Sequence, residues 1–94
     1  MPRPRNRRRV RGNPNSTYFK PAGIPKFKLE ESSLEMEEFE AIRLKDFLEL
    51  EQGECAKQMN ISQPTFHRII IKARKKVADA IVNGKAIEIK KWKY

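Results

Sequence analysis

Polar and basic side chains that could contact a nucleic acid lie between residues 52 and 76 of this 94-residue chain. Gln, His and Arg can form hydrogen bonds with base edges in the major groove of DNA, and an apolar side chain can contact a thymine methyl group. Five such residues follow one another at spacings that place them on one side of a helix. The candidates for base contacts are Gln63, Pro64, His67, Arg68 and Ile71.

The residues that must position these side chains follow the rhythm of two helices joined by a tight turn. Ala56 is small enough to let the helices cross closely, and Asn60 tolerates the left-handed backbone conformation that the turn needs. Ser62 can accept hydrogen bonds from the free amides of the second helix. A plain three-helix core without any DNA contact is the alternative interpretation. The matching positions are Gln52, Ala56, Asn60, Ser62 and Phe66.

Further polar and basic residues flank the predicted recognition helix and could bind the DNA backbone. Phosphate contacts of this kind fix the register of a protein on DNA without reading its sequence. The candidates for phosphate contacts are Gln52, Lys57, Ser62, Thr65, Lys72, Arg74 and Lys75, and Lys76 extends the same basic run.

Charge is segregated along the chain, which carries a formal net charge of +9. Residues 1–30 hold nine basic side chains and one acid, residues 31–54 two basic and nine acidic, and residues 55–94 ten basic and two acidic. Basic ends favour a polyanionic partner such as nucleic acid, although a solvated surface is the simpler explanation. The acidic run 35–40 is interpreted as a solvated helix face. The alternatives are that it keeps this face away from DNA phosphates or that it binds a neighbour's basic arm.

Residues 1–16 form a basic arm in which prolines and arginines alternate, and two prolines within four residues exclude a helix. We expect this arm to be extended and mobile in the absence of a partner, with a short strand near residues 8–11 as the alternative. It could follow phosphates or an adjacent minor groove. Its basic residues are Arg3, Arg5, Arg7, Arg8, Arg9 and Arg11.

Residues 17–94 are expected to form one small helix-turn-helix domain of the mainly α class. Helices are predicted over about 35–48, 51–59 and 63–83, with Ser32 or Ser33 capping the first. Gly84 would end the third helix, and the tail could add a short strand over 86–92. Residues 17–29 are expected to form an ordered loop whose aromatic side chains pack on the domain. The inward positions predicted on the third helix are Phe66, Ile69, Ile70, Ala73, Val77 and Ile81.

Other functional classes find little support in the residues. Cys55 is the only cysteine and His67 the only histidine, so neither an internal disulfide nor a metal cluster is expected. We find no phosphate-binding glycine loop and no nucleophile with a matched base. We therefore expect no enzyme activity, no cofactor, no metal, no small-molecule substrate, no membrane association and a cytoplasmic location at the nucleoid.

Four stretches carry a resemblance to a known family: "MPRPRNRRRV", "YFKPAGIP", "EFEAIRLKD" and "ISQPTF". Over roughly residues 1–90 the chain resembles an uncharacterised family of short bacterial and archaeal proteins that are predicted to bind DNA. The helical part is also similar to region 4 of bacterial sigma factors, including the "ARKKV" run at 73–77. The resemblance implies a helix-turn-helix that binds promoter DNA.

The residues and the resemblance together predict sequence-specific binding of double-stranded DNA and a role in transcription regulation. A homodimer is expected, because one small recognition helix gives limited affinity, and a contact with RNA polymerase is a further expected partner. Two alternatives stay open. The first is an RNA- or ribosome-associated protein that uses the arginine-rich arm. The second is a protein-interaction module that does not bind duplex DNA.

Overall fold

The computed structural model describes residues 8–91 and contains three helices and a three-stranded sheet. The strands are β1 (Tyr18–Phe19), β2 (Glu31–Glu35) and β3 (Ala86–Lys90), and the helices are α1 (Met36–Ile42), α2 (Gln52–Met59) and α3 (Gln63–Asn83). A π-helical turn, Arg43–Phe47, continues α1, and a single 3-10 turn occupies Lys26–Lys28. Within residues 8–91, no helix has both the length and the apolar composition needed to cross a membrane.

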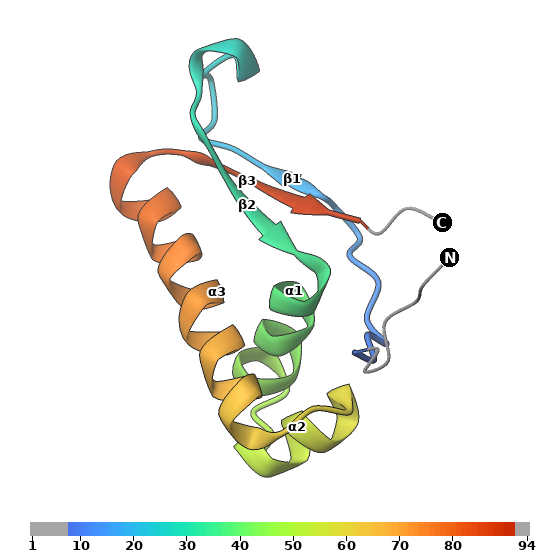
Figure 1. The fold of residues 1–94 in the computed structure, drawn as a ribbon. Helices are drawn as coiled ribbons and strands as arrows, with labels where there is room; N and C mark the ends of the chain where they lie inside the picture. The colour runs from blue at the N-terminus through green and yellow to red at the C-terminus, as the bar shows by residue number, and fades with distance from the viewer. Residues whose placement is uncertain (1–7, 92–94) are drawn as a thin grey trace, which may run out of the picture.

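The sheet is mixed, and its central strand comes from the C-terminal end of the chain. The strand order is β1-β3-β2, with β1 antiparallel and β2 parallel to β3. Ser33 lies opposite Glu88 and Leu34 opposite Ile89 in the parallel pair. The helices α1 and α3 lie on one side of this sheet, and α2 lies at the far end of the molecule (Figure 1).

The predicted mainly α class is therefore wrong, because a sheet forms a second layer of the fold. Side chains alternate between buried and exposed positions along β2, with Ser32 and Leu34 inward, as expected for a half-buried strand. The Ser32 hydroxyl donates to the Lys76 carbonyl at 3.0 Å, which ties β2 to α3. Local patterns in a short segment could not reveal this pairing, because the partner strand lies more than fifty residues further along the chain.

The first helix also begins differently from the prediction, since neither Ser32 nor Ser33 caps it. Both serines belong to β2, and Glu35 is the N-cap of α1. Glu35 and Glu38 form a reciprocal capping box, in which each side chain accepts a hydrogen bond from the other residue's backbone amide. The helix thus starts where the strand ends, without a connecting loop.

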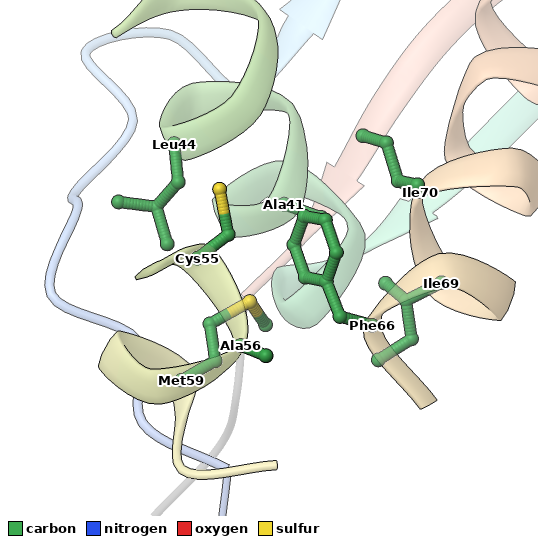
Figure 2. Packing of buried hydrophobic residues seen from close by; sticks show 8 residues of the cluster. All are labelled: Ala41, Leu44, Cys55, Ala56, Met59, Phe66, Ile69 and Ile70. Carbon is green, nitrogen blue, oxygen red and sulfur yellow. The ribbon is translucent and has the colours of Figure 1, made fainter. Parts of the chain in front are cut away.

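Two apolar clusters form the core. One lies where α1, α2 and α3 meet, and its side chains converge on Phe66 (Figure 2). The other lies between the sheet and α3 and contains Leu34, Met36, Ala73 and Ile89. Both clusters draw on α3, which explains why a helix of 21 residues is needed in so small a protein.

Several apolar side chains predicted to pack are exposed. Ile81, predicted inward on α3, is 73% exposed, because its neighbour Ala80 occupies the inward position of this turn and is buried. The loop between β1 and β2 projects from the end of the sheet (Figure 1), which leaves Phe27 83% exposed. Tyr18 is held at the base of this loop, where its hydroxyl donates to Glu31 at 2.8 Å and Lys26 lies over its ring.

Candidate nucleic-acid interface

The connection between α2 and α3 is a three-residue turn with a defined backbone path. Asn60 adopts the left-handed conformation, with φ 60° and ψ 46°, and ends α2. The Ile61 amide donates to the Ala56 carbonyl at 3.0 Å, and the Ser62 hydroxyl accepts from the Thr65 amide at 3.3 Å. Asn60 tolerates positive φ better than most residues, and Ser62 is a favoured cap, so the sequence suits this turn.

Buried side chains hold the two helices at a fixed separation. Ala56 of α2 and Phe66 of α3 are both buried and belong to the same apolar cluster (Figure 2). Cys55 lies in the same cluster, and burial raises the pKa of its thiol. Gly53 faces the Gln63 side chain, whose amide nitrogen would lie 3.2 Å from an added Cβ. The first turn of α3 is thus fitted closely against α2.

The structure places every predicted base-contact residue on the exposed side of α3. This exposed face is continuous over the first three turns of the helix and has no acidic residue in it. Arg68 is partly held in place, since its guanidinium donates to the Thr65 hydroxyl at 3.3 Å. The exposed residues are Gln63, Pro64, His67, Arg68 and Ile71.

The predicted phosphate-contact residues divide into exposed and partly covered groups. Lys57, Ser62, Lys72, Arg74 and Lys75 are exposed, whereas Gln52 and Thr65 are half-buried. They surround the candidate base-contact face from both helices.

Two of the basic residues on α3 are engaged with acids of the same chain. Arg74 binds Asp46 with both a 2.6 Å and a 3.2 Å hydrogen bond, and these lower the pKa of Asp46. Lys76 donates to the buried Glu38 at 2.7 Å. Their charges are therefore partly neutralised before any partner binds, unlike those of Lys72 and Lys75, for which no ion pair is found within residues 8–91.

The part of the arm that the structure describes is bound to the domain and is not a free segment. The Arg9 amide donates to the Met59 carbonyl at 3.0 Å, and Arg8 forms a 2.9 Å ion pair with Glu37. No strand forms over residues 8–11. Residues 8–12 thus lie against the domain, contrary to the expectation of a free arm, whereas Arg3, Arg5 and Arg7 lie outside the described residues.

A buried carboxylate on α1 anchors this segment. Glu40 is 1% exposed and accepts hydrogen bonds from the Arg11 and Gly12 amides, both at 3.1 Å. The Arg43 guanidinium donates to both oxygens of the same carboxylate at 2.8 Å. An added Cβ at Gly12 would collide with the Arg43 side chain, which would have to shift away from Glu40. We call Glu40, Arg43, Arg11 and Gly12 the Glu40 clamp.

Electrostatics within the clamp favour the ionised carboxylate. Burial alone would raise the pKa of Glu40, but the side-chain hydrogen bonds from Arg43, the two backbone amides and the Arg43 charge together lower it below its ordinary 4.5. The acidic run 35–40 is therefore not a solvated face. The segregation of acids from the basic arm was the signal that could have revealed this contact.

The clamp brings Arg8 beside the α2–α3 turn. An open cleft of about 590 Å³ lies there, between Arg8 and Lys57, with Asn60, Ser62 and Thr65 completing its walls. Cationic and hydroxyl side chains from three separate segments thus meet at the start of α3. The helix pattern alone revealed Lys57, Ser62 and Thr65, but not that Arg8 would join them.

Comparison with known proteins places the whole chain in one family. A family model described as "Protein of unknown function DUF134" matches residues 1–94. The chain is 61% identical over 94 residues to a UPF0251 protein of Caldanaerobacter subterraneus subsp. tengcongensis, covering all of this chain and 80% of that protein. It is 58% identical to a UPF0251 protein of Thermoanaerobacter pseudethanolicus with the same coverage.

A third relative is the UPF0251 protein of Dehalococcoides mccartyi strain BAV1, which is 58% identical over 89 residues, or 95% of this chain and 76% of that protein. No solved structure matches the chain significantly. The comparisons thus identify the family, and its function has to be inferred from the site.

Proposed function

We propose that this chain, which belongs to the DUF134 family of proteins of unknown function, binds double-stranded DNA with sequence preference through α2, the turn and α3. In this proposal α2, the turn and α3 act as a helix-turn-helix similar to that of sigma factor region 4, set within a fold of helices and a sheet. The N-terminal turns of α3 enter the major groove, as recognition helices do. The role is regulation of transcription.

The observation that carries the proposal is the pairing of a rigid turn with an exposed, polar face on the helix that follows it. Asn60 and Ser62 fix where α3 begins, and Phe66 anchors its buried side. The opposite side presents Gln63 and Arg68, whose side chains suit adenine and guanine edges respectively. A helical hairpin that served only as a core would not need this set of side chains.

Charge supports the same surface. Lys57, Lys72 and Lys75 flank the exposed face of α3, and Arg8 lies across the cleft from Lys57. Acidic residues near this surface are engaged, with Asp46 bound to Arg74 and Glu37 to Arg8. The remaining free cations therefore attract the phosphates on both sides of a groove.

The proposal also includes a homodimer, because a single recognition helix of this size contacts few base pairs and natural sites for such proteins are commonly paired. The RNA-binding alternative uses the same arginine-rich arm, residues 8–12 of which lie against the domain, and competition between duplex DNA and RNA distinguishes the two. Backbone amides of that segment are committed to Glu40 and to the α2 terminus.

The test starts from selection of binding sites out of random duplex DNA with the purified chain, followed by titration of the selected duplex. Arg68→Ala should cost about tenfold or more in affinity for the selected site and relax its sequence at one position. Lys75→Ala should instead weaken all duplexes to a similar extent and reduce the salt slope by about one. Gln63→Ala is a second variant at a predicted base-contact position on the same face of α3, and it tests sequence preference in the same way.

Competition gives the outcome that would contradict the proposal. Unlabelled duplex DNA should displace the selected site better than single-stranded or hairpin RNA of equal length. If RNA competes better, or if neither Arg68→Ala nor Gln63→Ala changes the preference for the selected site, the assignment of α3 as a reading helix is wrong.

A further inference from the structure

Ile71 is the one large aliphatic residue within the exposed face formed by Gln63, Pro64, His67, Arg68 and Ile71. It follows Ile69 and Ile70, which are both buried, yet it is itself 49% exposed. A β-branched side chain on a helix has essentially one rotamer, so its methyl groups are held in a fixed direction. Exposed leucine or isoleucine is common on protein surfaces, and the surroundings of this residue decide whether it has a role.

The surroundings form an open depression of about 560 Å³ with an apolar floor and a cationic rim. Ile71, the one aliphatic side chain in its lining, is accompanied there by His67, Arg68, Lys72 and Lys75, and the atoms that line it are almost all apolar. Long basic side chains lay their methylene stems along apolar surface and keep their charged ends in water. The depression therefore combines an apolar centre with a ring of positive charge.

We propose that this depression receives the 5-methyl group of a thymine in the major groove, which makes Ile71 a specificity-determining residue. This inference rests on the proposed function. A thymine methyl is a small apolar group on a base edge in the major groove, and the groove is bordered by the phosphates of both backbones, so the pair matches an apolar lining with cationic side chains around it. Ile71 lies eight residues after Gln63 on the same face, a rise of about 12 Å, so it follows the base-contact residues along α3 when the helix lies in the major groove.

Charge argues against a second copy of the chain as the occupant. An isologous contact places the same patch of both subunits together. Such a contact on this depression would bring Arg68, Lys72 and Lys75 against their own copies, and Asp79, one turn after Lys75, is already paired with Lys85. Like charges facing one another across an interface disfavour binding, whereas the phosphates of DNA neutralise the same rim.

Deoxyuridine provides a direct test, since it differs from thymine in duplex DNA only by the 5-methyl group. Each thymine of the selected site is replaced in turn, and the affinity of the chain for each duplex is measured. At one or two positions the unmodified chain should lose about fourfold in affinity, the amount expected for burial of one methyl group. Ile71→Ala should bind the thymine duplex more weakly and lose its response to deoxyuridine at the same positions.

Val82→Ala is the matched control, because Val82 is an exposed aliphatic residue of α3 outside the depression. It should keep the full response to deoxyuridine. Sequence-preferring binding that no deoxyuridine weakens, or an Ile71→Ala chain that keeps the response, overturns this inference and leaves the proposed function standing. Loss of a dimer on Ile71→Ala, seen by sedimentation with the response to deoxyuridine retained, identifies the depression as a subunit contact. Absence of duplex binding by the unmodified chain overturns the proposed function and this inference together.

Discussion

Individual residues at the α2–α3 turn act through backbone conformation more than through contacts. Asn60 carries a positive φ of 60°, which costs most residues with a Cβ energy that asparagine partly avoids. Ser62 satisfies an amide of the first turn of α3 with its side chain. These two residues therefore determine the direction in which α3 leaves α2, and with it the orientation of the face that carries Arg68.

The cost of losing the turn residue can be measured by substitution. Asn60→Ala should lower the free energy of unfolding by about 1 kcal/mol, because alanine tolerates the left-handed conformation less well than asparagine does. For a domain of this size, that corresponds to a decrease in Tm of roughly 4–8 °C.

Asn60→Gly is the control, since glycine adopts positive φ without a steric penalty. It should melt within a few degrees of the unmodified protein. Equal Tm values for the alanine and glycine variants would contradict the strain argument.

At the scale of elements, the main finding is that α1 binds the basic segment of its own chain. The Glu40 clamp holds residues 11 and 12, and Glu37 holds Arg8. This contact links the arm to α1, and the Arg9 amide links it to the end of α2. Arg8 is therefore held beside the cleft at the α2–α3 turn.

Acidification should remove the contribution of the clamp. The pKa of Glu40 is lower in the folded protein than its ordinary 4.5, so the carboxylate stabilises the fold fully above that value and progressively less as pH falls below it. Glu40→Gln should lower the free energy of unfolding by about 2–4 kcal/mol at pH 7, since the half-buried Arg43 and two amides lose an ionised acceptor that is itself buried. The difference from the unmodified protein should shrink below pH 4, as measured by urea denaturation at each pH.

Two further variants test whether the loss of stability comes from the Glu40 clamp. Glu51→Gln removes an exposed carboxylate and should change stability by less than about 0.5 kcal/mol at any pH. Gly12→Ala should also disrupt the Glu40 clamp, because the added Cβ would displace the Arg43 side chain. A Glu40→Gln deficit that stays constant from pH 7 to pH 3 would show that the carboxylate charge is not responsible.

At the scale of the molecule, the two layers of the fold have separate tasks. The helical end carries the turn and the exposed face of α3, whereas the sheet covers the other half of α3 (Figure 1). β3 is the central strand and pairs with both neighbours, so the C-terminal segment completes the domain. The proposed DNA-binding surface thus depends on residues that lie far from it along α3.

Substitution within β3 distinguishes this arrangement from an independent three-helix domain. Ile89 is 6% exposed and packs with Leu34, Met36 and Ala73. Ile89→Ala should therefore lower the free energy of unfolding by about 2–4 kcal/mol, as removal of buried aliphatic groups does.

Lys90→Ala, at the neighbouring exposed position, should change the stability by less than about 0.5 kcal/mol. Thermal unfolding followed by circular dichroism measures both variants. If Ile89→Ala has the same Tm as the unmodified protein, the sheet does not contribute to the stability of the helices.

The sequence by itself determined the features that depend on neighbours along the chain. Helical periodicity, a tolerant asparagine, a serine cap and a glycine stop are local signals, and α2, α3 and their turn lie where those signals put them. The candidate contact residues on the outer side of α3 follow from the same periodicity, because a residue that the core does not use must face outward.

Only the tertiary structure decided the features that join distant segments. The parallel pairing of β2 with β3, the burial of Glu40 by residues 28 and 29 positions away, and the ion pair of Arg74 with Asp46 all depend on contacts across the fold. In the sequence the partner of β2 is not apparent, so its serines resemble helix caps. The cation beside Glu40 is not apparent either, so this glutamate resembles part of a solvated face. The physical reason is that the free energy of strand pairing or burial depends on both segments in contact, whereas a local sequence pattern contains only one of the two segments.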